Sequence, residues 1–222
     1  MAFQIAIDGP AGSGKSTVAK ALAAKLGFIH IDTGAMYRSI ALYVHNNNID
    51  AENENAVLSC LPHIDIKLEY INGKQKTILN GIDVSLDIRT AEIGELASKV
   101  AKYGALRRHL VSMQQTMAEN KNVVMDGRDI TTVVLKNADV KVYLDASIEV
   151  RAQRRVEELE KLGKNPDFNT IANQIKKRDF DDKNHAESSF RVAVDAYYID
   201  TSNKVMDEVI DDIMKLVGVQ FV

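Results

Sequence analysis

The sequence predicts an α/β protein whose core is a five-stranded parallel sheet with helices on both faces. Three observations support this fold class. A glycine-rich loop follows the first apolar run, later apolar runs alternate with helical patterns, and one central stretch has the period of antiparallel strands. Alternating strands and helices are typical of parallel sheets, because parallel strands need a crossover connection. We therefore expect a parallel core that carries a small antiparallel insertion.

The first strand is expected at 3–7, and the loop after it is the strongest local motif. The loop fits the phosphate-binding pattern G-x-x-x-x-G-K-[ST]. Its glycines let the backbone approach a polyphosphate with the N–H groups turned inward, and the next helix offers its positive end to the same charge. Lys15 is placed to reach the β- and γ-phosphates, and the Ser16 hydroxyl is placed to ligate Mg²⁺. The expected nucleotide-binding residues are Gly9, Pro10, Ala11, Gly12, Ser13, Gly14, Lys15, Ser16 and Thr17.

A second strand is expected at 28–31, after a helix that Gly27 ends. Asp32 and Thr33 follow this strand directly. Ligands of open α/β sheets gather at the carboxyl ends of the strands, so both residues lie at the expected functional edge. Arg38 comes about one turn into the next helix, whereas His30 is interpreted as a structural residue of the sheet.

The stretch from about 62 to 95 changes period. Apolar and charged residues alternate over 64–70, and Asn-Gly pairs at 72–73 and 80–81 separate the next two short runs. Asn-Gly is the preferred sequence of two-residue hairpin turns, so the stretch predicts a three-stranded antiparallel meander. We interpret it as an insertion within a single domain that spans 1–222. A helical region is expected to follow at about 91–119.

Two more buried strands are expected at 122–125 and 140–144, and charged residues follow each of them. The first is followed by Asp126-Gly127-Arg128-Asp129, a run that suits a functional site better than a core. A polar helical stretch at about 150–185 contains several arginines and is broken near Asn165-Pro166. Because it has few apolar residues, we interpret it as a mobile lid. A last strand at 197–199 and a final helix complete the pattern.

Composition narrows the function classes. The chain has 222 residues, 45% of them apolar, and a formal net charge of −3, which argues against general nucleic-acid binding. We expect no membrane-spanning segment, because no stretch is long and uncharged enough. We expect no secretory signal, because the N-terminus runs directly into the first strand. Cys60 is the single cysteine, which suits a reducing cytoplasm. Nothing indicates an obligate oligomer, so we expect a monomer.

Several stretches together carry a family resemblance. They are Ile7-Asp8-Gly9 with the phosphate loop that follows, Asp32-Thr33-Gly34-Ala35-Met36-Tyr37-Arg38, Asp126-Gly127-Arg128-Asp129, Thr132-Val133-Val134, Asp145-Ala146-Ser147 and Asp200-Thr201-Ser202. They resemble the bacterial cytidylate kinases of the P-loop nucleoside monophosphate kinase superfamily. The resemblance covers essentially the whole chain, and it implies that the antiparallel insertion belongs to the monophosphate-binding part. It implies transfer of the γ-phosphate of ATP to CMP or dCMP, with Mg²⁺ as cofactor.

The resemblance also implies roles for individual residues. Asp32, Thr33 and Tyr37 would line the acceptor pocket, and Arg38 and Arg128 would hold the CMP phosphate. Ser98, Arg107 and Asp129 would recognise cytosine, which offers an amine donor to a carboxylate and acceptors to Arg and Ser. Asp182 would bind the sugar hydroxyl. The expected catalytic residues are Lys15, Arg128, Arg154 and Arg178.

The chain departs from the family pattern at a few positions. Thr131 stands where the family usually has glycine, and Ser189-Phe190 stand where it has Pro-Leu. His185 replaces an arginine, which would remove one phosphate ligand, and the neighbouring Lys183 is a candidate to compensate.

Two alternatives remain open. A different small phosphate acceptor would keep the chain a kinase, and a P-loop regulatory NTPase would give it no second substrate. The cytosine-recognising set argues against the first alternative, and the arginine-rich lid argues against the second. In the favoured reaction the acceptor phosphate, with a second pKa of about 6, is already a nucleophilic anion at neutral pH, so no general base is required.

Overall fold

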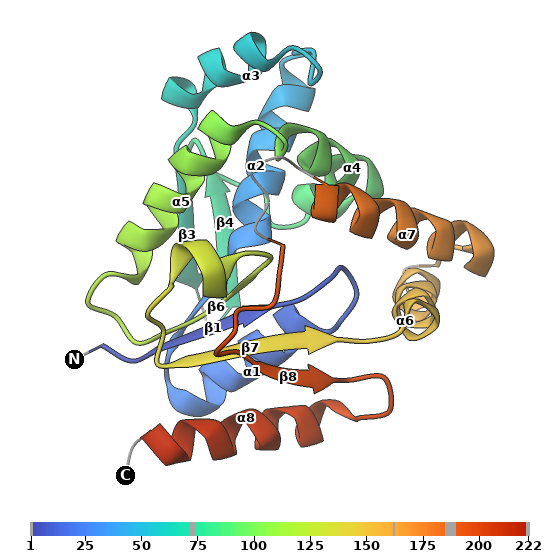
Figure 1. Cartoon of the computed structure of the whole chain (residues 1–222). Helices are drawn as coiled ribbons and strands as arrows, with labels where there is room; N and C mark the ends of the chain where they lie inside the picture. Colours follow the sequence, from blue (N-terminus) through green and yellow to red (C-terminus); the bar gives the residue numbers. More distant parts are fainter. Residues whose placement is uncertain (1, 72–73, 162, 185–189, 221–222) are drawn as a thin grey trace. The chain divides into compact units, whose positions relative to one another are not determined.

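The computed structural model describes residues 2–71, 74–161, 163–184 and 190–220 (Figure 1). The chain divides into two compact units, which are treated separately below. The first consists of Met1–His30 and Ala118–Val222, and the second of Ile31–Met117. No helix in the described part of the chain is long and apolar enough to cross a membrane.

The main sheet has five strands in the order β2-β6-β1-β7-β8. The strands are β1 (Gln4–Asp8), β2 (Ile29–Asp32), β6 (Val123–Gly127), β7 (Val140–Asp145) and β8 (Tyr197–Asp200). β1 pairs in parallel with β6 and β7, and β7 pairs in parallel with β8. At the carboxyl ends Asp8 lies opposite both Gly127 and Tyr143. The predicted parallel sheet is therefore confirmed, and its strand ends meet at one edge.

Two helices pack against the central strands in the first unit: α1 (Lys15–Leu26) and α8 (Met206–Gln220) (Figure 1). Their buried residues Leu22 and Ile213 join Ile5 and Val142 of the sheet in one apolar cluster. Burial of such side chains stabilises the fold by about 1.5–3 kcal/mol each. A π-helical turn at Ile130–Val134 follows β6 and was not predicted.

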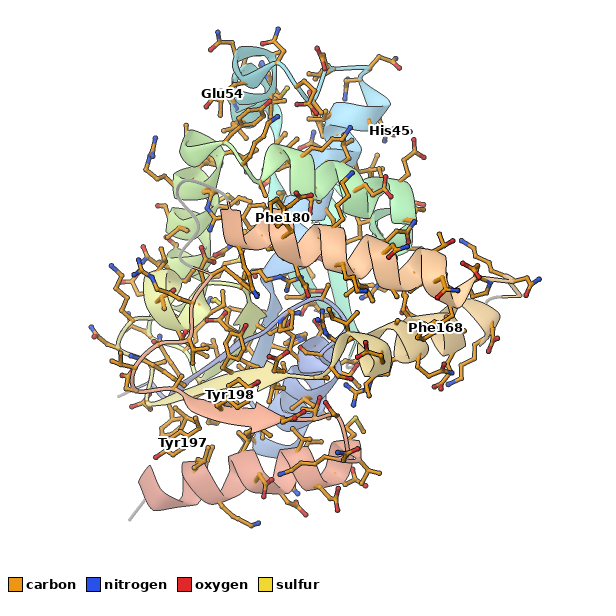
Figure 2. The ribbon with its side chains drawn as sticks, turned by 45° about the vertical axis from the view of Figure 1, so that its right-hand side comes forward. His45, Glu54, Phe168, Phe180, Tyr197 and Tyr198 are labelled. Carbon is orange, nitrogen blue, oxygen red and sulfur yellow. The ribbon has the colours of Figure 1, made fainter. Side chains whose placement is uncertain are left out.

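The predicted lid is a pair of helices, α6 (Ile148–Lys161) and α7 (Phe168–Asn184). The hairpin has few apolar residues, as predicted, but four of them form a small core. Ala152 and Val156 of α6 pack with Ile171 and Ile175 of α7, and all four are buried. The remaining faces are polar, although Phe180 of α7 is exposed (Figure 2). The hairpin therefore has a small core of its own, and its mobility stays a prediction.

β8 carries an aromatic pair at the outer end of the sheet order. Tyr197 and Tyr198 are both exposed (Figure 2). The Tyr198 hydroxyl donates to Asp145 Oδ2 at 2.9 Å, and its ring stacks on Tyr143 with centroids 5.8 Å apart. Partial burial, together with the bond to Asp145, raises the pKa of Tyr198 to about 12. The Tyr198 hydroxyl is therefore neutral at physiological pH and holds β8 to the end of β7.

The second unit joins helices to a small antiparallel sheet. Its elements are α2 (Thr33–Asn46), α3 (Glu54–Cys60), η1 (Leu61–His63), β3 (Ile66–Ile71), β4 (Lys74–Leu79), β5 (Ile82–Asp83), η2 (Asp87–Arg89), α4 (Ala91–Val100) and α5 (Gly104–Ala118). The strand order β3-β4-β5 confirms the predicted meander. The first Asn-Gly turn, at 72–73, lies outside the described residues. In the second, Asn80 has a φ of 49° and Gly81 a φ of 85°, as a two-residue hairpin turn requires.

The helical region expected at 91–119 is present as two successive helices, α4 and α5. Between them, the Tyr103 hydroxyl donates to the Ala51 carbonyl at 2.7 Å. α3 was not predicted. It is short and is capped by Asn53, whose side chain accepts from the Ala56 N–H at 3.1 Å. Val57 buries its side chain in the core of the unit, which holds this short helix in place.

Candidate functional site

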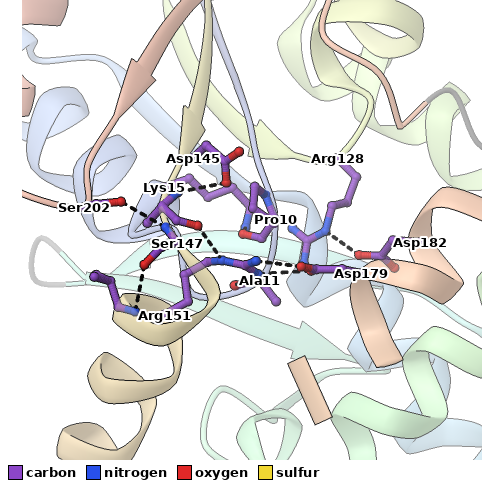
Figure 3. A network of polar contacts seen from close by, with 12 residues as sticks. Pro10, Ala11, Lys15, Arg128, Asp145, Ser147, Arg151, Asp179, Asp182 and Ser202 are labelled. Atoms are coloured by element: carbon purple, nitrogen blue, oxygen red, sulfur yellow. Dashed lines mark hydrogen bonds and ion pairs between the residues drawn. The ribbon is translucent and has the colours of Figure 1, made fainter. Parts of the chain in front are cut away.

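The phosphate loop of the first unit is held closely against β7. Gly9 has a φ of 156°, and a Cβ atom there would lie 2.0 Å from the Leu144 carbonyl oxygen. Lys15 is buried, and its Nζ donates to the Pro10 carbonyl at 3.0 Å (Figure 3). Burial, assisted by the nearby Arg128 charge, lowers the pKa of Lys15 to about 7. A bound polyphosphate would counteract both effects, so the buried ammonium suits an anionic ligand.

Ser16, at the start of α1, is bonded to the end of β6. Its hydroxyl donates to Asp126 Oδ2 at 2.5 Å, and His30 Nε2 lies 2.7 Å from Asp126 Oδ1. His30, interpreted from the sequence as a structural residue, therefore contacts the same carboxylate as Ser16. Hydroxyl and carboxylate oxygens are the ligands that Mg²⁺ prefers, usually with phosphate oxygens and water. Ser16 and Asp126 therefore fit a magnesium site beside the phosphate loop.

Arg128 and Asp182 form an ion pair in the same unit. Arg128 Nε donates to Asp182 Oδ2 at 2.9 Å (Figure 3). Burial opposes the charge on Arg128, but the Asp182 carboxylate outweighs it and raises the arginine pKa. Burial likewise opposes the charge on Asp182, but Arg128 and Arg178 outweigh it and lower the carboxyl pKa. Three predicted site residues are thereby gathered into one charged cluster whose field reaches Lys15.

Arg154, predicted to act on the transferring phosphate, lies between the phosphate loop and the end of β8. Its Nη1 donates to Thr201 Oγ1 at 3.0 Å and, at 3.4 Å, to the Ser13 carbonyl. Its Nη2 donates to the Thr201 carbonyl at 2.6 Å. The guanidinium is therefore oriented by the backbone on both sides, next to the loop that would hold the triphosphate.

Asp8 ties β1 to the segment after β6. Its carboxylate accepts from the N–H groups of Ile130 and Thr131 at 2.9 and 2.8 Å, and from the Thr131 hydroxyl at 2.6 Å. Asp129, the predicted cytosine-recognising carboxylate, directly precedes this segment and is 7% exposed. Asp8 therefore positions the backbone next to Asp129.

Other predicted acceptor residues belong to the second unit. Asp32 caps α2 by accepting from the Ala35 N–H at 3.0 Å, and its other oxygen accepts from Arg38 Nη2 at 3.0 Å. A Cβ at Gly34 would lie 3.1 Å from both partners of this pair, so glycine permits their approach. Thr33 is buried and Tyr37 half-buried beside them. The structure thus brings the predicted residues of the α2 start together.

Ser98 and Arg107, predicted to recognise cytosine, lie on the successive helices α4 and α5 and are half-buried. A groove of about 470 Å³ in this unit is lined instead by the far end of α2, the β4–β5 hairpin and the start of α4. None of the predicted acceptor residues lines this groove.

Comparison with known proteins decides the family. The sequence model of the cytidylate kinase family matches residues 5–218. The chain belongs to the cytidylate kinase family. It is 45% identical over 215 residues to a cytidylate kinase of Lactobacillus johnsonii, covering 97% of this chain and 94% of the relative. It is 43% identical over 218 residues to a cytidylate kinase of Thermotoga maritima, covering 98% and 97%.

Likeness to solved structures supports the fold. The crystal structure of an uncharacterized protein from Eubacterium ventriosum superposes with a TM-score of 0.53. That protein is 16% identical to the chain, and the match covers 97% of this chain and 98% of the other.

One departure from the cytidylate kinase pattern has a structural explanation. The family usually has glycine at position 131, which has no hydroxyl. The hydroxyl of Thr131 donates a third hydrogen bond to Asp8. Phe190 is half-buried, with its ring centroid 6.3 Å from that of Tyr143. His185 and Ser189 lie outside the described residues.

Sequence reasoning did not single out three polar residues of this candidate site. They are Asp8, Arg151 and Asp179. Asp8 stands at the carboxyl end of β1, beside the run that begins at Asp126, which is a signal that could have identified it. Arg151 and Asp179 pair across the α6–α7 hairpin, and a charge pattern alone does not identify such a partner.

We expect Asp8 to make the free energy of unfolding depend on pH. Burial raises its pKa from 3.8 to about 6. The folded state therefore binds more protons than the unfolded state between these values, and stability falls as the pH rises through the window. In urea titrations, the unfolding free energy of wild type minus that of Asp8→Asn should fall by roughly 2 kcal/mol from about pH 4 to pH 7. A difference that is flat or rises with pH would contradict the assignment.

Proposed function

We propose that this protein transfers the γ-phosphate of ATP to CMP or dCMP, which yields ADP and CDP or dCDP. The observation that carries the proposal is membership of the cytidylate kinase family over nearly the whole chain. The gathering of Lys15, Arg128 and Arg178 into one charged cluster supports it, because two polyanionic substrates need concentrated positive charge.

The phosphate loop would bind ATP through the backbone of residues 9–17, with Lys15 at the β- and γ-phosphates. Ser16 would ligate Mg²⁺ directly, and Asp126 would hold the Ser16 hydroxyl and the metal's water shell. When bound, Mg²⁺ neutralises charge that develops on the phosphate oxygens.

Different acceptor residues would bind different parts of CMP. Arg38 and Arg128 are proposed for its phosphate, Asp182 for its sugar hydroxyl, and Ser98, Arg107 and Asp129 for cytosine. Asp32, Thr33 and Tyr37 would complete the wall of the pocket. The Arg128–Asp182 and Arg38–Asp32 pairs support these roles, because each carboxylate holds a guanidinium group ready for a phosphate.

Catalysis would depend on positioning and charge neutralisation. The CMP phosphate attacks as an anion, so the chain must hold two mutually repelling phosphates in line. Arg154 and Arg178, on the two helices of the hairpin, would add positive charge around the transferring group. Closure of the hairpin would exclude water, which otherwise competes as acceptor.

The direct test measures ADP release with ATP and Mg²⁺ in the presence of CMP, dCMP, UMP, AMP or GMP, with a control that contains no acceptor. Turnover with CMP and dCMP alone is the expected result. Release of ADP without an acceptor would favour an NTPase, and turnover with a different monophosphate would reassign the acceptor.

We further propose that the enzyme works as a monomer in the cytoplasm, binds neither nucleic acid nor membrane, and elutes as a monomer in size-exclusion chromatography.

Asp129→Ala should separate acceptor recognition from ATP binding. Loss of a charged hydrogen-bonding partner of the base should raise the KM for CMP by about 30-fold, while the KM for ATP changes little. Steady-state kinetics with each substrate varied in turn would measure this. Equal increases in both constants would mean that Asp129 has a structural role and that cytosine is recognised elsewhere.

A further inference from the structure

Two carboxylates of α7 lie about one turn apart, and each binds an arginine from another element of the first unit. Asp182 accepts from Arg128, which follows the central strand β6. Asp179 accepts from Arg151, which lies in the first turn of α6. The proposed reaction assigns substrate contacts to the first pair and leaves the second pair without a role.

The Arg151–Asp179 pair is bidentate and buried. Nη1 of Arg151 donates to Asp179 Oδ1 at 3.1 Å, and Nη2 donates to Oδ2 at 2.7 Å (Figure 3). The side chains are 5% and 14% exposed. A pair of this geometry is strongly directional, and a buried guanidinium left without its carboxylate is costly.

The same guanidinium also holds the phosphate loop. Nη1 of Arg151 donates to the Ala11 carbonyl at 3.1 Å, while Nε donates to the Ala146 carbonyl at 2.9 Å. Gly12 packs on the arginine as well, since a Cβ at Gly12 would lie 3.1 Å from Arg151 Cβ. Arg151 is therefore a bridge between α7 and the phosphate loop.

This bridge fixes the direction of one loop peptide. A trans peptide group points its C=O and N–H in opposite directions. Because Arg151 holds the Ala11 carbonyl toward itself, the Gly12 N–H points away from it. Gly12 has a φ of 79°, so the loop around it adopts a conformation that few residues other than glycine tolerate. The orientation of an N–H group that could bind phosphate thus depends on Arg151.

We propose that Arg151 and Asp179 are positioning residues that couple the seating of α7 to the ATP-binding conformation of the phosphate loop. The inference rests on the proposed function only in taking ATP as the ligand of that loop. Arg151 contacts the loop backbone, and Asp179 acts through Arg151. When α7 is seated, Asp179 aligns the guanidinium and the loop is ready for ATP. When α7 departs, Arg151 loses its carboxylate partner and the Ala11–Gly12 peptide loses its restraint.

The test compares three variants of the full chain. Asp179→Asn removes the charge, and Asp179→Glu keeps it but moves it by one methylene. Asp181→Asn is the matched control, because Asp181 lies on the same helix and its side chain makes no hydrogen bond or ion pair with any described residue. Binding of a non-hydrolysable ATP analogue with Mg²⁺ and without CMP would be measured by calorimetry, and thermal unfolding would be recorded for each variant.

We expect Asp179→Asn to raise the Kd of the analogue about ten-fold or more, and Asp179→Glu to raise it about three-fold. Asp181→Asn should match wild type in every measurement. Where Asp179→Asn does not fold, Asp179→Glu decides the question. An analogue Kd for Asp179→Glu equal to that of Asp181→Asn would overturn the proposal.

A double-mutant cycle adds a readout that a general loss of stability would not reproduce. Arg151→Lys keeps the charge but cannot form the bidentate pair. If the two residues act as one bridge, Arg151→Lys with Asp179→Asn should bind the analogue within about three-fold of the weaker single variant. Fully multiplicative effects would show two independent roles and would contradict the bridge.

The outcomes also separate this inference from the proposed function. Wild type that transfers phosphate to CMP, with a Kd independent of Asp179, would refute the bridge alone. Wild type that ignores CMP, with a Kd that depends on Asp179, would refute the acceptor and support the bridge.

Discussion

Lys15→Met should lower kcat by about a thousand-fold while leaving the protein folded. The loss follows from removal of a buried positive charge that we propose lies at the transferring phosphate, where no water can replace it. Rapid-quench measurement of CDP formation, with ATP and CMP both saturating, would give the value directly.

Stability should respond to Lys15→Met in the opposite sense to activity. Burial lowers the pKa of Lys15 to about 7, so the free folded protein disfavours the charged form that the unfolded chain carries at neutral pH. This contribution destabilises the fold at and below pH 7 and diminishes as the pH rises toward the ordinary lysine pKa. Thermal unfolding at pH 7 should therefore show no loss of Tm.

Lys20→Ala is the control for this experiment. Lys20 lies on the same helix, but its side chain is exposed. Its kinetic constants should equal those of wild type. A Lys15→Met enzyme that retains more than about a tenth of wild-type kcat would exclude the proposed role of Lys15.

Gly9→Ala should destabilise the first unit by about 3 kcal/mol and abolish ATP binding. The new Cβ would lie 2.0 Å from the Leu144 carbonyl oxygen, and that oxygen belongs to a buried strand that cannot move away. Overpacking of this kind forces a backbone shift, and the φ of 156° adds strain for alanine. Urea unfolding followed by circular dichroism would measure the loss.

Gly27→Ala separates the two contributions. Gly27 also has a positive φ, 70°, but a Cβ there would meet no described atom within 4 Å. We expect a loss of about 1 kcal/mol from backbone strain alone, with ATP binding unchanged. If both variants lose the same free energy of unfolding, the close packing of Gly9 on β7 does not explain why position 9 requires glycine.

Much of the architecture follows from local sequence patterns. The strands of both sheets, the helix after the phosphate loop and the β4–β5 hairpin lie close to their predicted positions. These features depend on residue periodicity and on glycine-dependent turns, which operate over a few neighbouring residues. The phosphate loop could also be predicted from neighbouring residues, because the spacing of its glycines, lysine and serine determines how they can contact a phosphate.

Local patterns were less informative where they are short or continuous. The break between α4 and α5 lies within a continuous helical pattern, and at this break the Tyr103 hydroxyl donates to the carbonyl of Ala51. α3 has seven residues, too few for a clear period, and the burial of Val57 stabilises it. The apolar residues of the α6–α7 hairpin form a core only because the two helices face each other.

The sequence alone therefore determined the family, the sheet and the phosphate loop, whereas the tertiary structure decided how the site is held together. Ser16 meets Asp126, and Arg151 meets Asp179 across the hairpin, through contacts between distant parts of the chain. Thr131 departs from the family pattern, and only the structure shows that its hydroxyl donates to Asp8. Charge and hydrogen-bonding capacity are properties of single residues, but the choice of partner depends on where the folded chain brings them.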